Sequence, residues 1–406
     1  MRIMISCGEA SGDLYAGALA AALRARAPDV EIVGFGGRRL QQAGASLVGE
    51  FTGLTVTGLT EAVRVLPRSF AMYRRLVAAA RGRRPDVFVA IDFPDFNFRL
   101  MAALRRLGVP VVYYVSPQLW AWRPGRMATM KRFVQRVLVI FPFEAPLYER
   151  VSIPVQFVGH PLVDLARARQ ARDVFLRDRG LRPDAPTVAL LPGSRPNELR
   201  RLAPVMAAAL PLVRARVPDA QFVVARAPYL PDVLFVPFVG RALSGSPGAP
   251  DTGVPAAPAR WGGVARPTIV VDEATDDVLA ASDVVITASG TATVQAALHE
   301  RPMVVVYQVS PLTYRLGKPF LKVDTYAMPN LVAGRRIVPE LIQDACTPER
   351  IAAEAVALLT DPDRHTRARA ALGEVRERLG GPGASGRAAD AILEVAVRAP
   401  GGATPA

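Results

Sequence analysis

The sequence predicts an α/β protein built from two doubly wound, Rossmann-like domains. Short apolar runs of strand character alternate with longer helical segments along most of the chain, which is typical of βαβ units and parallel sheets. The chain has 406 residues, of which 50% are hydrophobic. This length exceeds one ordinary core, so we expect domains at residues 1–165 and 166–380.

The predicted first domain begins with the strand Arg2–Cys7, which ends in the turn Gly8–Asp13. A helix from about Leu14 to Arg26 and a second strand at Glu31–Phe35 follow. Loops after the strands of such sheets bind ligands, so we expect this turn to line a substrate site. Its glycine spacing does not match the GxGxxG dinucleotide fingerprint, which counts against a nicotinamide enzyme.

Asp92 is the candidate general base. It ends the buried strand that begins at Pro85 and therefore lies at the carboxyl edge of the sheet, where a carboxylate can accept a proton from a bound substrate. Asp92 or Asp95 can instead cap the helix expected to begin near Asn97. We assign the cap to Asp95 and the chemistry to Asp92.

Aromatic side chains gather in the loops after two strands of this domain. Such side chains are costly at a surface unless they line a pocket or face lipid. We therefore expect a partly apolar cleft that suits acyl chains and raises the pKa of a nearby carboxyl group. The residues concerned are Phe93, Phe96, Phe98, Trp120 and Trp122.

The segment Glu61–Arg84 has apolar residues at helical spacing and many arginines. Such a basic amphipathic helix either lies on an anionic bilayer surface or packs its apolar side on the core with a solvated arginine face. At the end of the domain, His160 is as plausible as a hydrogen-bonding linker residue as it is as an acid or base.

The second domain contains the strand, glycine turn and helix start of Thr187–Glu198. Gly193 permits close backbone approach, Pro196 suits the first position of a helix, and Arg195 offers a permanent positive charge. Helix amides and the helix dipole attract anions, so this stretch predicts a phosphate site. The alternative is an ordinary strand-to-helix turn with a solvated arginine.

A second turn of the same kind follows the strand Asp283–Thr287. It is small, rich in hydroxyl groups and opens a helix, so its amides and hydroxyls converge on a second anion position. We infer one diphosphate held between the turns at Gly193 and Gly290. The residues 240–267 are rich in glycine and proline and predict a flexible insertion, whereas residues 381–406 predict a last helix and a disordered tail.

The net charge of +14 indicates an anionic partner: nucleic acid, an acidic membrane face or phosphorylated substrates. No nucleic-acid-binding motif appears, so we expect no nucleic-acid partner. Cys7 and Cys346 fit a reducing compartment, and the three histidines lack metal-ligand spacing, so no metal site is expected. No apolar run of 18 or more residues appears and no signal peptide is recognised, which predicts a cytoplasmic protein.

Several motifs agree in order and spacing with one family. They span nearly the whole chain apart from the insertion and the tail, and together they resemble the lipid-A-disaccharide synthase family. The motifs are Gly8–Asp13, Ile91–Asn97, Tyr114–Pro117 with Trp120–Arg123, Phe141–Glu144, Val158–Pro161, Leu191–Arg195, Ala288–Thr293 and Pro329–Asn330.

The resemblance implies a GT-B glycosyltransferase whose two domains face a central cleft. It implies an inverting reaction, without metal or cofactor, that joins UDP-2,3-diacylglucosamine to 2,3-diacylglucosamine 1-phosphate by a β-1,6 linkage and releases UDP. It also implies a peripheral protein on the cytoplasmic face of the inner membrane. The oligomeric state stays open, with a homodimer as one option.

By this resemblance Asp92 is the base, and Arg195 with the Gly290 turn stabilises the leaving diphosphate. Asn330 is expected in the donor site. Glu9, Ser11 and Asp13 are expected on the acceptor side. The remaining expected substrate-binding residues are Asn97, Ser116, Trp120, Trp122, His160, Gly193, Ser194, Ser289, Gly290, Thr291, Thr293 and Gln295.

Three positions depart from the family pattern. Cys7 stands where alanine is usual, and a buried thiol behaves as a small hydrophobe. Gln295 replaces a usual glutamate for the ribose hydroxyls, and Gln308 replaces a usual basic residue. The rival interpretations are a UDP-sugar 2-epimerase, a glycosyltransferase with a soluble acceptor, and a basic nucleic-acid-binding protein without catalysis.

Overall fold

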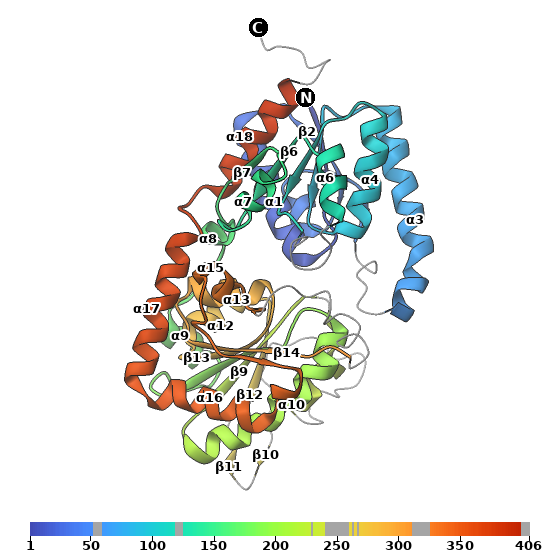
Figure 1. The fold of residues 1–406 in the computed structure, drawn as a ribbon. Helices are drawn as coiled ribbons and strands as arrows, with labels where there is room; N and C mark the ends of the chain where they lie inside the picture. The colour runs from blue at the N-terminus through green and yellow to red at the C-terminus, as the bar shows by residue number, and fades with distance from the viewer. Residues whose placement is uncertain are drawn as a thin grey trace. The chain divides into compact units, whose positions relative to one another are not determined.

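The computed structural model describes residues 1–51, 59–117, 125–228, 230–239, 260–261, 264–265, 268–310 and 325–398. The chain divides into two compact units (Figure 1). Unit 1 contains Met1–Asp164 and the C-terminal segment from Leu379, and unit 2 contains most of the chain between them. The last helix therefore belongs to the N-terminal unit.

Unit 1 is built on a parallel seven-stranded sheet with the strand order β3-β2-β1-β4-β5-β6-β7. This is the doubly wound Rossmann order, whose direction switches between β1 and β4. The strands are β1 (Arg2–Ser6), β2 (Glu31–Gly36), β3 (Ser46–Glu50), β4 (Val87–Ile91), β5 (Val111–Tyr114), β6 (Arg136–Val139) and β7 (Val155–Phe157).

Helices cover both faces of this sheet, which is why a strand such as β4 is buried along its whole length. The helices α1 and α18 pack against each other on one face, and α3, α4 and α6 lie on the other (Figure 1). The helices are α1 (Ala10–Arg26), α2 (Arg38–Gln42), α3 (Leu59–Gly82), α4 (Pro94–Arg106), α6 (Arg126–Phe133), α7 (Ala145–Glu149), α8 (Leu162–Leu165) and α18 (Ala384–Val397).

Unit 2 repeats this architecture with a parallel six-stranded sheet in the order β12-β9-β8-β13-β14-β15. Its direction switches between β8 and β13. The strands are β8 (Thr187–Leu191), β9 (Gln221–Arg226), β12 (Thr268–Asp272), β13 (Val284–Ala288), β14 (Met303–Tyr307) and β15 (Glu340–Ile342). The predicted fold class of two Rossmann-like domains is confirmed.

The helices of unit 2 flank this sheet, and α10 and α16 pack together over one of its faces. The helices are α9 (Arg172–Arg177), α10 (Pro196–Arg216), η1 (Asp232–Phe235), α11 (Val236–Val239), α12 (Thr275–Ala281), α13 (Thr291–Leu298), α15 (Met328–Ala333), η4 (Gln343–Ala345), α16 (Pro348–Thr360) and α17 (Pro362–Arg378). Among the described helices, none is long and apolar enough to cross a bilayer.

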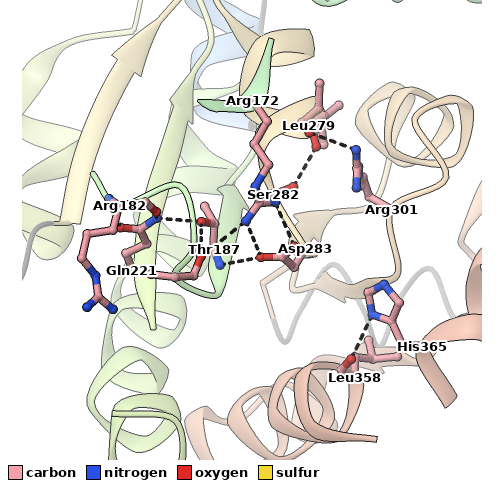
Figure 2. Close-up of polar contacts among 12 residues, drawn as sticks. Arg172, Arg182, Thr187, Gln221, Leu279, Ser282, Asp283, Arg301, Leu358 and His365 are labelled. Carbon is pink, nitrogen blue, oxygen red and sulfur yellow. Dashed lines mark hydrogen bonds and ion pairs between the residues drawn. The ribbon is translucent and has the colours of Figure 1, made fainter. Parts of the chain in front are cut away.

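A polar network fastens the amino edge of the second sheet (Figure 2). The Asp283 carboxylate accepts hydrogen bonds from the Arg172 guanidinium at 2.8 and 2.9 Å and from the Thr187 backbone N–H at 2.8 Å. The Gln221 side-chain amide donates to the Thr187 hydroxyl at 2.8 Å. These contacts tie together the starts of β8, β9 and β13, so this edge serves stability and leaves the carboxyl edge for ligands.

Two expectations about local structure were wrong. Helix α1 begins at Ala10, not near Leu14, and α4 begins at Pro94, not near Asn97. Within the segment predicted as a flexible insertion, β10 (Arg260–Trp261) pairs with β11 (Val264–Ala265) in a small antiparallel ladder. Propensity locates helix ends poorly, because tertiary contacts decide where the first turn closes.

Candidate active site

The candidate acceptor-side residues lie at the switch point of the first sheet. Strands β1 and β4 are hydrogen-bonded neighbours, with Ser6 beside Ala90, so the loops that follow them lie side by side. The loop after β1 carries Glu9, the extended N-cap residue of α1, and the loop after β4 begins with Asp92. Glu9, Ser11 and Asp92 are all partly exposed, as substrate contacts require.

Asp92 and Phe93 have an unusual backbone, because both adopt left-handed conformations with φ of 44° and 49°. Such angles are uncommon for residues other than glycine, and they occur at sites where the surrounding structure imposes them. The Asp92 carbonyl accepts hydrogen bonds from the Asn97 amide and the Tyr113 hydroxyl, each at 2.8 Å. Asp92 is therefore the strongest candidate base in unit 1, because its carboxylate is carried by a strained backbone beside the switch point of the sheet.

Gly8 is required by the Phe93 side chain. A Cβ atom at position 8 would lie 2.3 Å from the Phe93 ring, closer than any real contact. The ring also packs against Phe96, with centroids 5.4 Å apart. The turn after β1 and the turn after β4 therefore fit together only when residue 8 has no side chain.

The expectation of an aromatic cleft was wrong for two of its five residues. Phe96 and Phe98 are 6% and 9% exposed and belong to the hydrophobic core under α4, so they do not line an acyl site. Trp120 and Trp122 lie outside the described residues. Asp95 is not the N-cap residue of α4, because Phe93 occupies that position. Asp95 instead forms an ion pair with Arg126.

The Asp13 carboxylate is occupied within the fold and not by a substrate. It is buried and accepts hydrogen bonds from the backbone N–H groups of Gly37, Arg39 and Leu40 at 2.7, 2.8 and 3.1 Å. These contacts hold the first turn of α2, because a carboxylate satisfies the free amides at a helix N-terminus. We therefore remove Asp13 from the acceptor site.

Three other expected contacts of unit 1 also serve the fold. Asn97 is fully buried and donates to backbone carbonyls, and the buried Ser116 hydroxyl contacts the Tyr148 hydroxyl. Burial lowers the pKa of His160 to about 3, and its Nδ1 atom accepts a hydrogen bond from the Leu162 N–H at 3.1 Å. A neutral, buried imidazole of such low basicity is a hydrogen-bonding residue and not a general acid or base.

The candidate diphosphate site lies at the switch point of the second sheet. Strand β13 pairs with both β8 and β14, so the loops at their carboxyl ends are neighbours. After β8, Gly193 has φ of 120° and Arg195 is the N-cap of α10, with Pro196 at the first helical position. The exposed Ser194 lies between them. The predicted strand, glycine turn and helix start are thus present.

The turn after β13 has the second glycine. Gly290 has φ of 146°, and a Cβ atom there would meet no heavy atom within 4 Å, so this side of the turn is open. The Ser289 hydroxyl donates to the Tyr326 carbonyl at 3.0 Å and the Thr293 hydroxyl to the Gly290 carbonyl at 2.7 Å. Ser289 and Thr293 therefore shape the turn, while the backbone amides at the start of α13, from Thr291, offer the anion contacts.

Two residues that the sequence did not single out also belong to this edge. Glu198, one turn into α10, reaches back so that its Oε2 accepts a hydrogen bond from the Ser194 N–H at 3.2 Å, and its Oε1 lies 3.7 Å from the Arg195 guanidinium. Tyr307 ends β14, and its ring stacks with Tyr326 at 6.3 Å. Burial and the Glu198 charge raise the Tyr307 pKa, and the Arg195 charge opposes this shift. Tyr307 could have been found from the sequence, because it ends the strand that follows β13.

Asn330 and Gln295 contact other side chains of unit 2. The Asn330 side chain is buried and makes four hydrogen bonds: its amide donates to Val338 O and the Glu340 carboxylate, and its carbonyl accepts from Ile337 N and Val338 N. This side chain has no capacity left for a donor sugar, so the expected donor contact is replaced by a structural role. The Gln295 amide donates to Asp276 at 3.3 Å.

Two Rossmann-like units with candidate sites at their switch points define a glycosyltransferase fold of the GT-B type. The crystal structure of the glycotransferase of kitacinnamycin has a TM-score of 0.61 at 20% identity and covers 97% of this chain and 98% of that chain. UDP-GlcNAc 2-epimerase from Neisseria meningitidis, bound to UDP-GlcNAc, has a TM-score of 0.66 at 11% identity over 97% of this chain and 100% of that one. At these identities the likeness shows the fold alone.

The family is shown by sequence. The model of the lipid-A-disaccharide synthetase family matches residues 3–235 and 264–395. Lipid-A-disaccharide synthases of Myxococcus xanthus and Geobacter sulfurreducens are each 42% identical to this chain and cover 97% of both sequences compared. The chain therefore belongs to the lipid-A-disaccharide synthetase family and is a glycosyltransferase of lipid A biosynthesis, as its motifs predicted.

Proposed function

We propose that this enzyme transfers the sugar of UDP-2,3-diacylglucosamine to the 6-hydroxyl of 2,3-diacylglucosamine 1-phosphate. The products are the β-1,6-linked disaccharide 1-phosphate and UDP. Family membership supports the reaction class. The observation that carries the mechanism is the strained Asp92 at the switch point of the first sheet, where the fold holds one carboxylate next to the acceptor-side loop.

In the proposed step the acceptor oxygen attacks C1 of the donor from the face opposite UDP. Asp92 takes the hydroxyl proton as the new C–O bond forms, and the C1–O bond to the diphosphate breaks with its electron pair going to UDP. Backside displacement inverts the α-linked donor into a β-linked product. A single base is sufficient, because the leaving diphosphate is a weak base that needs charge stabilisation and no protonation.

Groups of unit 2 stabilise the leaving UDP in this proposal. Arg195 at the start of α10 supplies a guanidinium that can bind two phosphate oxygens. The amides at the start of α13 add the positive end of a helix dipole at the open Gly290 turn. Their preorganised charge replaces the function that a divalent metal has in other nucleotide-sugar enzymes.

We further propose that the protein binds the cytoplasmic face of the inner membrane through α3. Leu66 and Phe70 of this helix are 51% and 60% exposed, which is unusual for large apolar side chains. Arg68, Arg74 and Arg75 are exposed on the same helix. Apolar side chains that enter the headgroup region next to arginines that contact anionic lipids fit an interfacial helix, and the diacylated substrates reside in that region.

The test is acceptor-dependent release of UDP. Wild-type protein is incubated with UDP-2,3-diacylglucosamine with and without 2,3-diacylglucosamine 1-phosphate, beside Asp92→Asn and the neighbouring control Asp95→Asn. We expect release only with acceptor, loss in Asp92→Asn with donor binding retained, and activity in Asp95→Asn. Acceptor-independent UDP release would refute the synthase reaction and favour a hydrolysing UDP-sugar 2-epimerase or a glycosyltransferase with a soluble acceptor, whereas an active Asp92→Asn would remove Asp92 as base.

A further inference from the structure

Two tyrosines end strand β5 next to the proposed base. Tyr113 and Tyr114 are adjacent in sequence and both have 0% exposure. Because side chains alternate along a strand, they point to opposite faces of the sheet. Tyr113 belongs to the core cluster shared with α3, α4 and α6, and Tyr114 faces α18. The two residues are therefore a matched pair of equally buried tyrosines, of which Tyr113 contacts Asp92.

The Tyr113 hydroxyl on β5 donates a hydrogen bond at 2.8 Å to the Asp92 carbonyl, in the turn that follows the neighbouring strand β4. The Asn97 side-chain amide donates to the same oxygen, also at 2.8 Å. Both lone pairs of this carbonyl are thus used by buried donors. Burial and the Asp92 charge raise the pKa of Tyr113 well above its ordinary value, so the hydroxyl stays protonated and remains a donor.

These bonds act on a strained backbone. Asp92 and Phe93 have positive φ, and so does Val115 at the end of β5, with φ of 59°, which is rare for a β-branched residue. The Asp92 N–H donates to the Val115 carbonyl at 3.3 Å and links the two strained turns. Without a restraint on its carbonyl, the peptide after Asp92 would relax toward an ordinary conformation and redirect the carboxylate.

We propose that Tyr113 is a positioning residue for sugar transfer, whose hydroxyl fixes the Asp92 carbonyl and thereby aims the Asp92 carboxylate at the acceptor hydroxyl. This inference rests on the proposed function, in which Asp92 is the base. Tyr113 itself does not touch substrate. It acts through the backbone of Asp92, together with Asn97.

The test compares Tyr113→Phe with the control Tyr114→Phe. Each removes one buried hydroxyl from the same strand, and thermal unfolding reports whether both fold. We expect kcat to fall by about 10- to 100-fold in Tyr113→Phe, because a small misplacement of a reacting group has effects of this size. The KM for the donor should change by less than about twofold, since donor binding does not involve Asp92. Tyr114→Phe should retain wild-type kcat.

A double-mutant cycle separates positioning from general damage. In the Asp92→Asn background, Tyr113→Phe should lower the residual rate no further, because the group that it positions is gone. Asn97→Ala, which removes the second bond to the same carbonyl, should also lower kcat without raising donor KM. It provides the test if Tyr113→Phe does not fold.

The outcomes distinguish this inference from the proposed function. If the wild type shows no acceptor-dependent transfer, the proposed function fails. If the wild type is active and Asp92→Asn is not, while Tyr113→Phe keeps its kcat or loses no more than Tyr114→Phe, the positioning role is refuted and the base remains. An additive loss in the Asp92→Asn background would also overturn it.

Discussion

Replacing Glu198 with glutamine is expected to tighten the binding of UDP. In the structure the Glu198 carboxylate bonds the Ser194 N–H and faces the Arg195 guanidinium, the same groups that we assign to the diphosphate. A bound diphosphate must therefore displace this carboxylate or lie beside it. Glutamine keeps the size and one acceptor oxygen but removes the negative charge.

The expected magnitude follows from Coulomb's law. A phosphate oxygen that contacts Ser194 and Arg195 would lie about 4 Å from a carboxylate that stays in place, where two unit charges repel by about 1 kcal/mol in water and about 4 kcal/mol near a protein surface. The side chains of Arg195 and Glu198 are 39% and 24% exposed, so solvent screening favours the lower end. We expect about 1 to 2 kcal/mol, or a roughly 5- to 30-fold lower Kd.

Isothermal titration of UDP into wild type and Glu198→Gln measures this effect. Glu349→Gln is the matched control, because Glu349 is an exposed acidic residue in the first turn of α16 and its replacement changes the net charge equally. The control should keep the wild-type Kd. An unchanged or weaker Kd in Glu198→Gln would refute the reasoning and show that the carboxylate supports the turn. If wild type fails to bind UDP, the proposed site itself is wrong.

Three further predictions concern glycine packing, a buried amide and pH. Gly8→Ala should lower kcat by at least about 10-fold, because the new Cβ displaces Phe93 and with it the adjacent base, whereas Gly82→Ala, with nothing within 4 Å, should be active. Asn330→Ala should lower the free energy of unfolding by about 3 kcal/mol in denaturant titrations, because it leaves buried backbone groups without partners. The His160 pKa is about 3 in the folded protein and 6.5 for an unperturbed histidine, the value we take for the unfolded chain. The unfolded state therefore binds the proton first, and the free energy of unfolding falls as pH drops below about 6.5. At pH 5.5 this amounts to about 1.4 kcal/mol, a loss that His160→Phe should not show in thermal unfolding across pH.

Each of these predictions has a contradicting result. Wild-type kcat in Gly8→Ala would mean that the Phe93 ring moves without disturbing Asp92. An Asn330→Ala protein that unfolds like wild type but fails to bind UDP would return Asn330 to the donor site. An equal acid-induced loss of stability in wild type and His160→Phe would show that other groups titrate on unfolding and that His160 does not.

The sequence by itself determined the fold class, the family and the location of both candidate sites. Apolar runs such as Val87–Ile91 form strands through local pattern, and a turn such as that at Gly193 is read from residue type, since positive φ favours glycine. In a doubly wound sheet a residue that follows a strand must lie at the carboxyl edge. Asp92, Arg195 and Gly290 could therefore be placed without coordinates.

Only the tertiary structure decided which polar side chains remain available for substrate. Asp13 and Asn330 have the right chemistry and stand in the right motifs, yet neighbours as far away as Leu40 and Val338 use their hydrogen-bonding capacity. The same holds for Tyr113, whose partner is the Asp92 carbonyl in the turn after the neighbouring strand. Hydrogen-bond satisfaction depends on groups that folding brings together, and local sequence does not encode those distances.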